Sequence, residues 1–129
     1  PPRFGHAILR SLAEAYYVVA VTLKVRGANP IPERKVFTTS LLERGREMLL
    51  RKQISTESAL SKDIFDTALR LAEHRELLVR NSDDLAERRE QFAQEALDIL
   101  AAVNLLQDAY DAAWFPPLGV AAVRTEPKP

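Results

Sequence analysis

The chain has 129 residues, 47% of them hydrophobic and 28% charged, which suffices for one globular domain with a buried core. Its four glycines and the lack of a long polar tract argue against disorder over most of its length. It contains no cysteine, which excludes disulfides, thiolate metal ligands and a cysteine nucleophile. Basic and acidic residues number 18 each. Residues 1–54 contain ten basic and four acidic side chains, whereas residues 81–129 contain four basic and nine acidic ones. The start of the chain is therefore basic and its end acidic.

The first predicted element is a helix over about residues 4–26. It ends at Gly27, because the prolines of GANPIP (27–32) remove backbone donors and favour extended geometry. Its apolar run AYYVVAVTL (15–23) is shorter than the roughly 20 residues that a membrane-spanning helix needs, so we expect a core or interfacial helix. The opening PPRFGH has no signal-peptide pattern, and because it starts with proline rather than methionine we expect a truncated or processed piece.

A second helix is predicted over about residues 33–53. A glycine costs about 1 kcal/mol in a helix interior relative to alanine, so Gly45 indicates that another helix packs closely at this point. Large apolar side chains surround Gly45 near one face of the helix. They are Phe37, Leu41, Met48 and Leu49.

Six basic side chains of this second helix are the candidates for contact with a membrane surface or another domain. Arg34 and Lys52 are 18 residues, or five turns, apart and align, whereas Arg44 and Arg51 lie on a neighbouring strip. Two interpretations remain open: a solvated helix that pairs with the acidic fourth helix or another domain, or a loose contact with anionic lipid head groups. The six residues are Arg34, Lys35, Arg44, Arg46, Arg51 and Lys52.

The stretch QISTESALSKDIFDTALRLAEHREL (53–77) predicts the third helix and its start. Ser55 or Thr56 can cap the N-terminus, and Ser58 and Ser61 offer a second cap, so a short helical turn can precede the main helix. Apolar side chains then recur at helical spacing and form a stripe wide enough for a bundle core. The stripe consists of Leu60, Ile64, Phe65, Ala68, Leu69, Leu71 and Ala72.

The fourth predicted helix begins near residue 83. Ser82 or Asp83 can cap it, and Asp84 and Glu87 are favourable at the positive end of the helix dipole. About 30 residues follow without proline or glycine and carry a repeated apolar seam. The seam consists of Leu85, Phe92, Ala96, Ile99, Val103, Leu106 and Tyr110.

These elements predict an all-α protein, an antiparallel bundle of about four helices, because no stretch alternates like a β-strand. The helical domain is expected over residues 1–113. The segment 114–129 contains four prolines and is expected to form an extended, proline-rich tail.

Sequence motifs for catalysis, metal binding and nucleotide binding are absent. His6 and His74 lack the partner residues of a zinc helix or a di-iron bundle, and no nucleophile elbow, P-loop or dinucleotide fingerprint occurs. A DNA-reading helix made from residues 57–76 would be net negative and would repel phosphate. We therefore expect no catalytic residue, no metal site, no cofactor and no nucleic-acid partner in this chain.

Residues 41–77 combine three spaced motifs. A helix that contains Gly45-Arg46 and Leu49-Leu50 leads to ISTESALS (54–61), and FDTALRLAEHR (65–75) forms the next helix. In order and spacing, these motifs resemble the C-terminal region of membrane-associated glycerol-3-phosphate acyltransferases of the bacterial PlsB type. The flanking LAEAYYVVAVTL and RREQFAQEALDIL also look like that family's neighbouring helices, so the resemblance covers about residues 8–105.

The resemblance implies a parent enzyme that transfers an acyl group from acyl-CoA or acyl carrier protein to the 1-hydroxyl of glycerol 3-phosphate. This is the first step of phospholipid synthesis, at the cytoplasmic face of a membrane. Catalysis in the family rests on a His-x4-Asp motif, in which the carboxylate orients the general base. Here Ser11 and Val79 occupy the fifth positions after His6 and His74, so no catalytic residue carries over.

What the resemblance implies for this chain is a non-catalytic helical C-terminal domain. Its expected partners are the catalytic domain of the same protein and an anionic membrane surface, and its expected location is peripheral to the cytoplasmic face of the membrane. The alternative is a free-standing helical adaptor that binds a partner protein.

Overall fold

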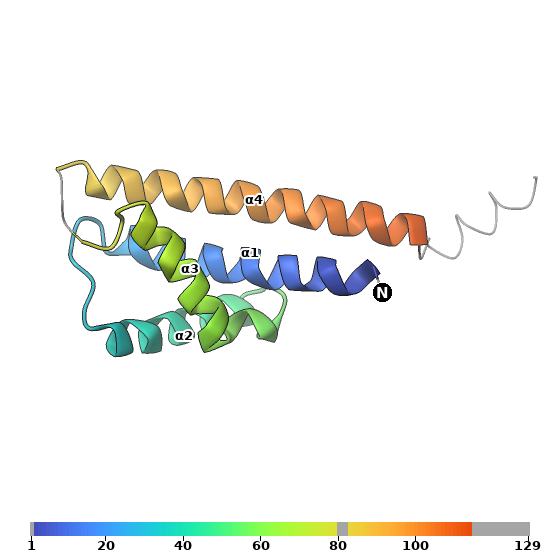
Figure 1. Cartoon of the computed structure of the whole chain (residues 1–129), viewed down its shortest axis with the longest axis horizontal. Helices are drawn as coiled ribbons and strands as arrows, with labels where there is room; N and C mark the ends of the chain where they lie inside the picture. Colours follow the sequence, from blue (N-terminus) through green and yellow to red (C-terminus); the bar gives the residue numbers. More distant parts are fainter. Residues whose placement is uncertain (1, 80–82, 115–129) are drawn as a thin grey trace, which may run out of the picture.

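The computed structural model describes residues 2–79 and 83–114, and of residues 2–8, 110, 111 and 114 it describes the backbone alone. Among these residues the chain forms four α-helices and a short 3-10 helix, η1, with no strand (Figure 1). The predicted all-α class is confirmed, whereas residues 115–129 of the expected tail lie outside the described residues. The helices are α1 (Pro2–Val25), α2 (Arg34–Leu50), η1 (Glu57–Leu60), α3 (Lys62–His74) and α4 (Leu85–Trp114).

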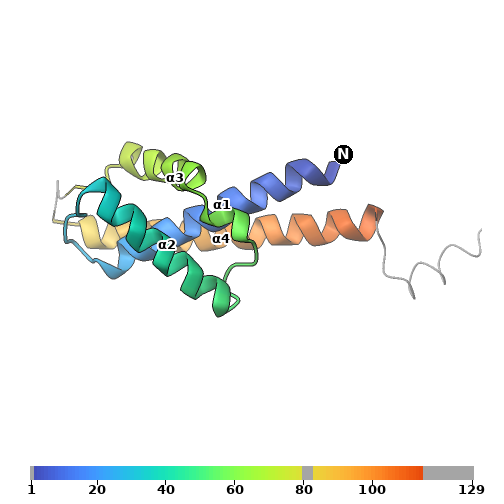
Figure 2. The same cartoon turned by 90° about the horizontal axis from the view of Figure 1, so that it is seen from below.

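Helix α1 is the centre of the fold. Helix α4 packs along it in the opposite direction, while α2, η1 and α3 pack on its other sides (Figures 1 and 2). In the described part of the chain, no Cα atom of α2 or α3 lies within 8 Å of a Cα atom of α4. A helix contacted from several sides must be apolar around most of its circumference, and Val18, Val19, Ala20 and Leu23 are all buried. The helices are therefore arranged around α1 rather than in a regular square bundle.

Helix α1 ends where the sequence predicts. Gly27 has a φ of 63°, the left-handed conformation that favours glycine, and its N–H donates to the carbonyl of Lys24 at 3.0 Å. The chain then crosses to α2 through residues 28–33. No described helix has both the length and the hydropathy needed to span a membrane.

The close helix contact predicted at Gly45 is present. Gly45 lies on the buried face of α2 together with Phe37, Leu41 and Met48. A methyl group at Gly45 would overlap the Cδ2 atom of Leu60 in η1. The glycine therefore allows η1 to pack directly against α2.

The two candidate caps of the third helix behave differently. The hydroxyl of Ser61 accepts a hydrogen bond from the N–H of Ile64 at 3.2 Å and caps α3, and the predicted short turn before it is η1. Ser55 and Thr56 do not cap a helix, because their side chains donate to a carboxylate of α1.

One member of the apolar stripe predicted for the third helix is not buried. Leu71 is 42% exposed, because α3 packs on α1 and has no helix against the side that faces α4. The other members are buried or partly buried. These residues are Leu60, Ile64, Phe65, Ala68, Leu69 and Ala72.

The apolar seam predicted for the fourth helix is wrong at Ile99 and Leu106, whereas its members Leu85, Phe92, Ala96 and Val103 are buried. Ile99 and Leu106 are 45% and 56% exposed, whereas Leu100 is buried. An α-helix has about 3.6 residues per turn, so a strict seven-residue repeat rotates by about 20° per heptad and leaves the line of contact. Ser82 and the side chain of Tyr110 lie outside the described residues. The buried residues of α4 are Leu85, Arg89, Phe92, Ala93, Ala96, Leu100, Val103 and Gln107.

Candidate functional site

Three of the six basic residues predicted to contact a membrane or another domain have acidic neighbours. Arg34 lies 3.9 Å from the carboxylate of Asp66, which joins α2 to α3. Arg44 and Arg51 lie 3.8 and 3.5 Å from the carboxylate of Glu47. These charges are therefore partly neutralised within the domain.

The other three basic residues, Lys35, Arg46 and Lys52, are exposed. They form no ion pair within the described residues. Lys35 and Arg46 are 11 residues apart, about three turns, and lie on the side of α2 away from its buried face. The structure therefore divides the six candidates into a paired set and a set whose charges face solvent.

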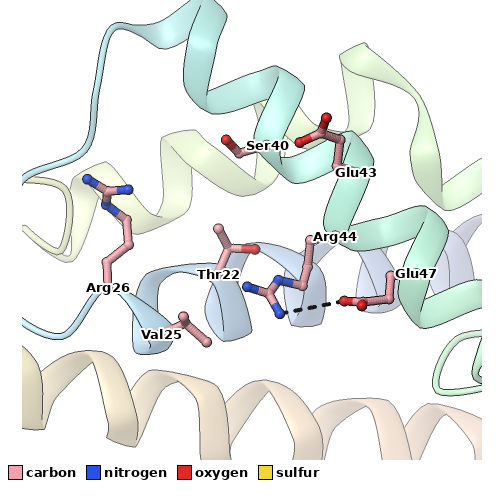
Figure 3. A pocket seen from close by; sticks show the side chains of 7 residues that line it. All are labelled: Thr22, Val25, Arg26, Ser40, Glu43, Arg44 and Glu47. Atoms are coloured by element: carbon pink, nitrogen blue, oxygen red, sulfur yellow. Dashed lines mark ion pairs between the residues drawn. The ribbon is translucent and has the colours of Figure 1, made fainter.

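A polar groove of about 610 Å³ lies between α2 and the last turns of α1 (Figure 3). Two arginines and two glutamates line it, and Arg44 forms its ion pair with Glu47 there. The hydroxyls of Thr22 and Ser40 donate to carbonyls of their own helices. Because the charges balance and the hydroxyls are engaged, the groove offers neither an activated nucleophile nor an anion site. Its lining residues are Thr22, Val25, Arg26, Ser40, Glu43, Arg44 and Glu47.

A buried carboxylate joins α1 to the loop before η1. Glu14 is 1% exposed and accepts hydrogen bonds from the backbone N–H and the hydroxyl of Ser55, both at 2.8 Å. It also accepts from the N–H and the hydroxyl of Thr56, at 3.0 and 2.7 Å. A buried carboxylate is costly unless its oxygens have donors, which explains why two predicted caps bind Glu14 instead.

Sequence reasoning missed this contact, although the sequence contains a signal for it. Ser11 and Glu14 are polar residues one helical turn apart, and both are buried on α1. The hydroxyl of Ser11 lies 2.6 Å from that of Ser58, so both polar residues of α1 meet the loop around η1. Two buried polar residues one turn apart on a helix indicate a polar contact inside the fold.

A second buried charge ties together three segments at the opposite end of α1. Arg89 of α4 is fully buried, and its guanidinium donates to the carbonyls of Gly27 and Asn29 at 3.0 and 2.7 Å. It also donates to the carbonyls of Leu77 and Leu78, at 2.8 and 3.4 Å. Burial, followed by the nearby charges of two other arginines, lowers the pKa of Arg89. The sequence analysis did not predict this buried arginine.

Arg75, just after α3, forms the third cross-link of the fold. Its guanidinium binds the carboxylate of Glu95 on α4 at 2.7 and 3.1 Å, and its Cζ atom lies 5.2 Å from the centre of the Phe92 ring. The hydrogen bond from Arg75 lowers the pKa of the Glu95 carboxyl. Burial raises the pKa of the neighbouring Tyr16 phenol. This pair holds the end of α3 against α4.

The structure describes the side chain of only one of the two histidines. His74 lies at the end of α3 beside apolar residues, and the side chain of His6 is outside the described residues. No group of three histidine, aspartate or glutamate side chains that could hold a metal ion occurs in the described part of the chain.

Comparison with known proteins identifies the family. The family described as the glycerol-3-phosphate acyltransferase C-terminal region matches residues 1–81. The chain belongs to this family. Proteins from Mycobacterium bovis and from two strains of Mycobacterium tuberculosis, which carry the name acyltransferase plsB1, are 35% identical to it over 105 residues. That region is 81% of this chain but 17% of each relative, so the chain spans a small part of the relatives' length. No solved structure matches.

Most residues that carry the resemblance to this acyltransferase family have structural roles. Gly45 admits Leu60, Ser61 caps α3, and Arg75 joins α3 to α4. These contacts position the helices relative to one another. The remaining buried members fill the core: Ile54, Phe65, Ala68, Leu69 and Ala72.

Proposed function

We propose that this chain is the non-catalytic helical C-terminal domain of a glycerol-3-phosphate acyltransferase of phospholipid biosynthesis. The parent enzyme transfers an acyl group from acyl-CoA or acyl carrier protein to glycerol 3-phosphate, and this domain supports its catalytic domain. The observation that carries the proposal is the structural use of the family motifs: Gly45, Ser61 and Arg75 pack, cap and bridge helices.

The requirements of the reaction support the same proposal. Attack of a hydroxyl group on a thioester needs a general base to accept the proton, commonly a histidine oriented by a carboxylate. In this chain neither histidine is followed at the fifth position by an acidic residue, since Ser11 and Val79 stand there. The base must therefore come from another part of the parent protein.

We expect the purified chain alone to give no acyl transfer, whereas the full-length protein transfers the acyl group of acyl-CoA to glycerol 3-phosphate. The reason is the missing general base. Product formation is measured with both proteins, and helical circular dichroism of the isolated chain shows that inactivity is not a failure to fold. Turnover by the isolated chain that His6→Ala or His74→Ala abolishes would contradict the proposal.

The second part of the proposal places the domain at the cytoplasmic face of the membrane, through the solvent-facing side of α2. Lys35 and Arg46 on α2 and Lys52 in the turn after it supply positive charge, and the exposed Val36 and Leu50 supply apolar surface. A basic side chain near an anionic surface contributes up to about 1 kcal/mol. Each basic residue therefore contributes little to membrane binding, and the contributions of the three residues add.

We expect this chain to co-sediment with anionic vesicles and to lose that binding as salt screens the charges. Lys35, Arg46 and Lys52 changed together to Gln should weaken binding by up to about fivefold per residue, which corresponds to about 1 kcal/mol each.

The matched control replaces the three arginines that have acidic neighbours, Arg34, Arg44 and Arg51, with Gln. It removes the same number of positive charges. Its effect should be smaller, because Asp66 and Glu47 already neutralise part of those charges. Equal binding to neutral vesicles, or no binding at low salt, would leave α2 without a membrane role.

A further inference from the structure

Helices α3 and α4 both pack on α1 but leave an open apolar groove between them. No Cα atom of α3 lies within 8 Å of a Cα atom of α4 among the described residues, and a groove of about 420 Å³ occupies the space. Its floor is α1 and its walls are α3 and α4. The apolar lining includes Leu9, Leu12, Ala13, Tyr16, Leu71 and Ile99.

The apolar surface continues from this groove along the outer face of α4. Ile99, Ala102, Leu106 and Ala109 are spaced by three or four residues, and all are exposed. The adjoining side of the same helix segment, with Leu100 and Val103, is already buried. A helix that is apolar around most of its circumference is normally covered by other parts of the protein. Ile99 and Leu106, which were predicted to be buried but are exposed, therefore belong to a second apolar face.

The charge of α4 excludes anionic lipid as the natural cover of this face. Residues 90–123 contain no lysine or arginine, and the exposed acidic residues of this stretch include Glu90, Asp98 and Asp108. An anionic membrane surface attracts basic segments and repels acidic ones. A polypeptide with apolar side chains and flanking lysine or arginine residues would complement both the surface and its charge.

A polypeptide long enough to provide this cover is implied by the comparison with relatives. The matched region is 17% of each curated relative, so about five-sixths of such a protein lies outside it. A covalently attached domain is present at high effective concentration, so a groove of this size suffices for stable docking. In contrast, α2 lies on the other side of α1 from α4 (Figures 1 and 2) and remains available for a different contact.

We propose that the α3–α4 groove and the outer face of α4 together form the surface on which the catalytic portion of the same acyltransferase docks. This inference rests on the proposed function and adds the surface that the contact uses. The occupant is an apolar segment of the catalytic portion with basic residues at its edges. Leu71, Ile99 and Leu106 are the central contacts, and the basic helix α2 is not part of this surface.

Cysteine labelling of the full-length protein tests the assignment. This chain has no cysteine, so a cysteine introduced at Leu71, Ile99 or Leu106 is the single one within it, and peptide mass spectrometry follows its reaction with a water-soluble maleimide. Val25→Cys at the end of α1 is the matched control, because Val25 is 63% exposed, Leu106 is 56% exposed, and Val25 belongs to neither the proposed membrane contact nor the proposed docking surface. Each rate is normalised to that of the same protein unfolded in urea.

The expected result is labelling at Leu71→Cys and Leu106→Cys at least about tenfold slower than at Val25→Cys, as for a contact that opens rarely. Ala102→Cys adds little volume on the same face and gives the same readout if Leu106→Cys does not fold. Equal rates at Leu106→Cys and Val25→Cys would overturn the proposal. Protection that disappears in detergent, or that requires high protein concentration, would also overturn it, in favour of a bilayer or a second copy.

The same preparation separates this inference from the proposed function. An active acyltransferase with unprotected cysteines refutes the docking surface and leaves the proposed function intact. A protein without acyltransferase activity in which Leu71→Cys and Leu106→Cys are protected refutes the proposed function and retains the docking surface.

Discussion

Replacing Arg89 with leucine should lower the free energy of unfolding by about 3–5 kcal/mol, because hydrogen bonds to a charged group contribute about 1.5–3 kcal/mol each and several are lost together. The guanidinium is fully buried and donates to four carbonyls, two in the turn after α1 and two in the segment after α3. Leucine fills part of the volume but supplies no donor, so buried carbonyls lose their hydrogen bonds at once. The end of α1, the end of α3 and the start of α4 would lose their shared attachment.

Urea denaturation followed by circular dichroism measures this loss. Arg46→Leu is the matched control, because Arg46 is an exposed arginine of α2 and a surface substitution usually changes stability by less than about 0.5 kcal/mol. Arg89→Lys should fall between the two, since one ammonium group cannot reach all four carbonyls. An Arg89→Leu protein as stable as the unchanged chain would mean that α4 does not hold these loops.

Features set by neighbouring residues could be predicted from the sequence. Gly27 ends α1 and Ser61 starts α3 because each determines the backbone or the hydrogen bonds of the next few residues. The cost of a glycine inside a helix predicted a close contact at Gly45, although it did not identify Leu60 as the neighbour. The all-α class follows from the same short-range patterns.

Contacts that depend on distant segments could not be predicted in the same way. The spacing from Leu85 to Phe92 leaves position 89 facing inward, but an inward arginine is acceptable only if carbonyls from residues 27, 29, 77 and 78 meet it. The prediction that Ile99 is buried was wrong, because the rotation of a straight helix against α1 decides which residue is buried. Leu100, one position later, takes that place.

The six basic residues also divide into contacts that the local sequence determines and contacts that depend on the packing of distant segments. Helical spacing alone places Arg44 and Arg51 within reach of Glu47, because residues three and four apart are neighbours on a helix. The contact of Arg34 with Asp66 needs the packing of α2 against α3, which no local pattern determines. The list of basic residues therefore came from the sequence, whereas the distinction between paired and solvent-facing charges required the structure.

Glu14→Gln should cost about 2–4 kcal/mol of unfolding free energy, since hydrogen bonds to a charged group contribute about 1.5–3 kcal/mol each and the amide can still accept some of them. The carboxylate of Glu14 accepts four hydrogen bonds from Ser55 and Thr56. The amide would turn its NH2 group towards two of these donors. Glu43→Gln is the matched control, because Glu43 is exposed on α2 and a surface substitution usually changes stability by less than about 0.5 kcal/mol.

Amide hydrogen exchange locates the effect of Glu14→Gln in the loop. The N–H groups of Ser55 and Thr56 donate to Glu14, so they should exchange slowly in the unchanged chain and much faster in the variant. Thr56→Val removes one hydroxyl donor and should cost less in the Glu14→Gln background than alone, because the two residues share a hydrogen bond. Additive costs, with unchanged exchange at Ser55 and Thr56, would show that this carboxylate does not hold the loop. If the coupling is found, a single residue of α1 fixes the loop that places η1 against Gly45 and leads to the cap at Ser61.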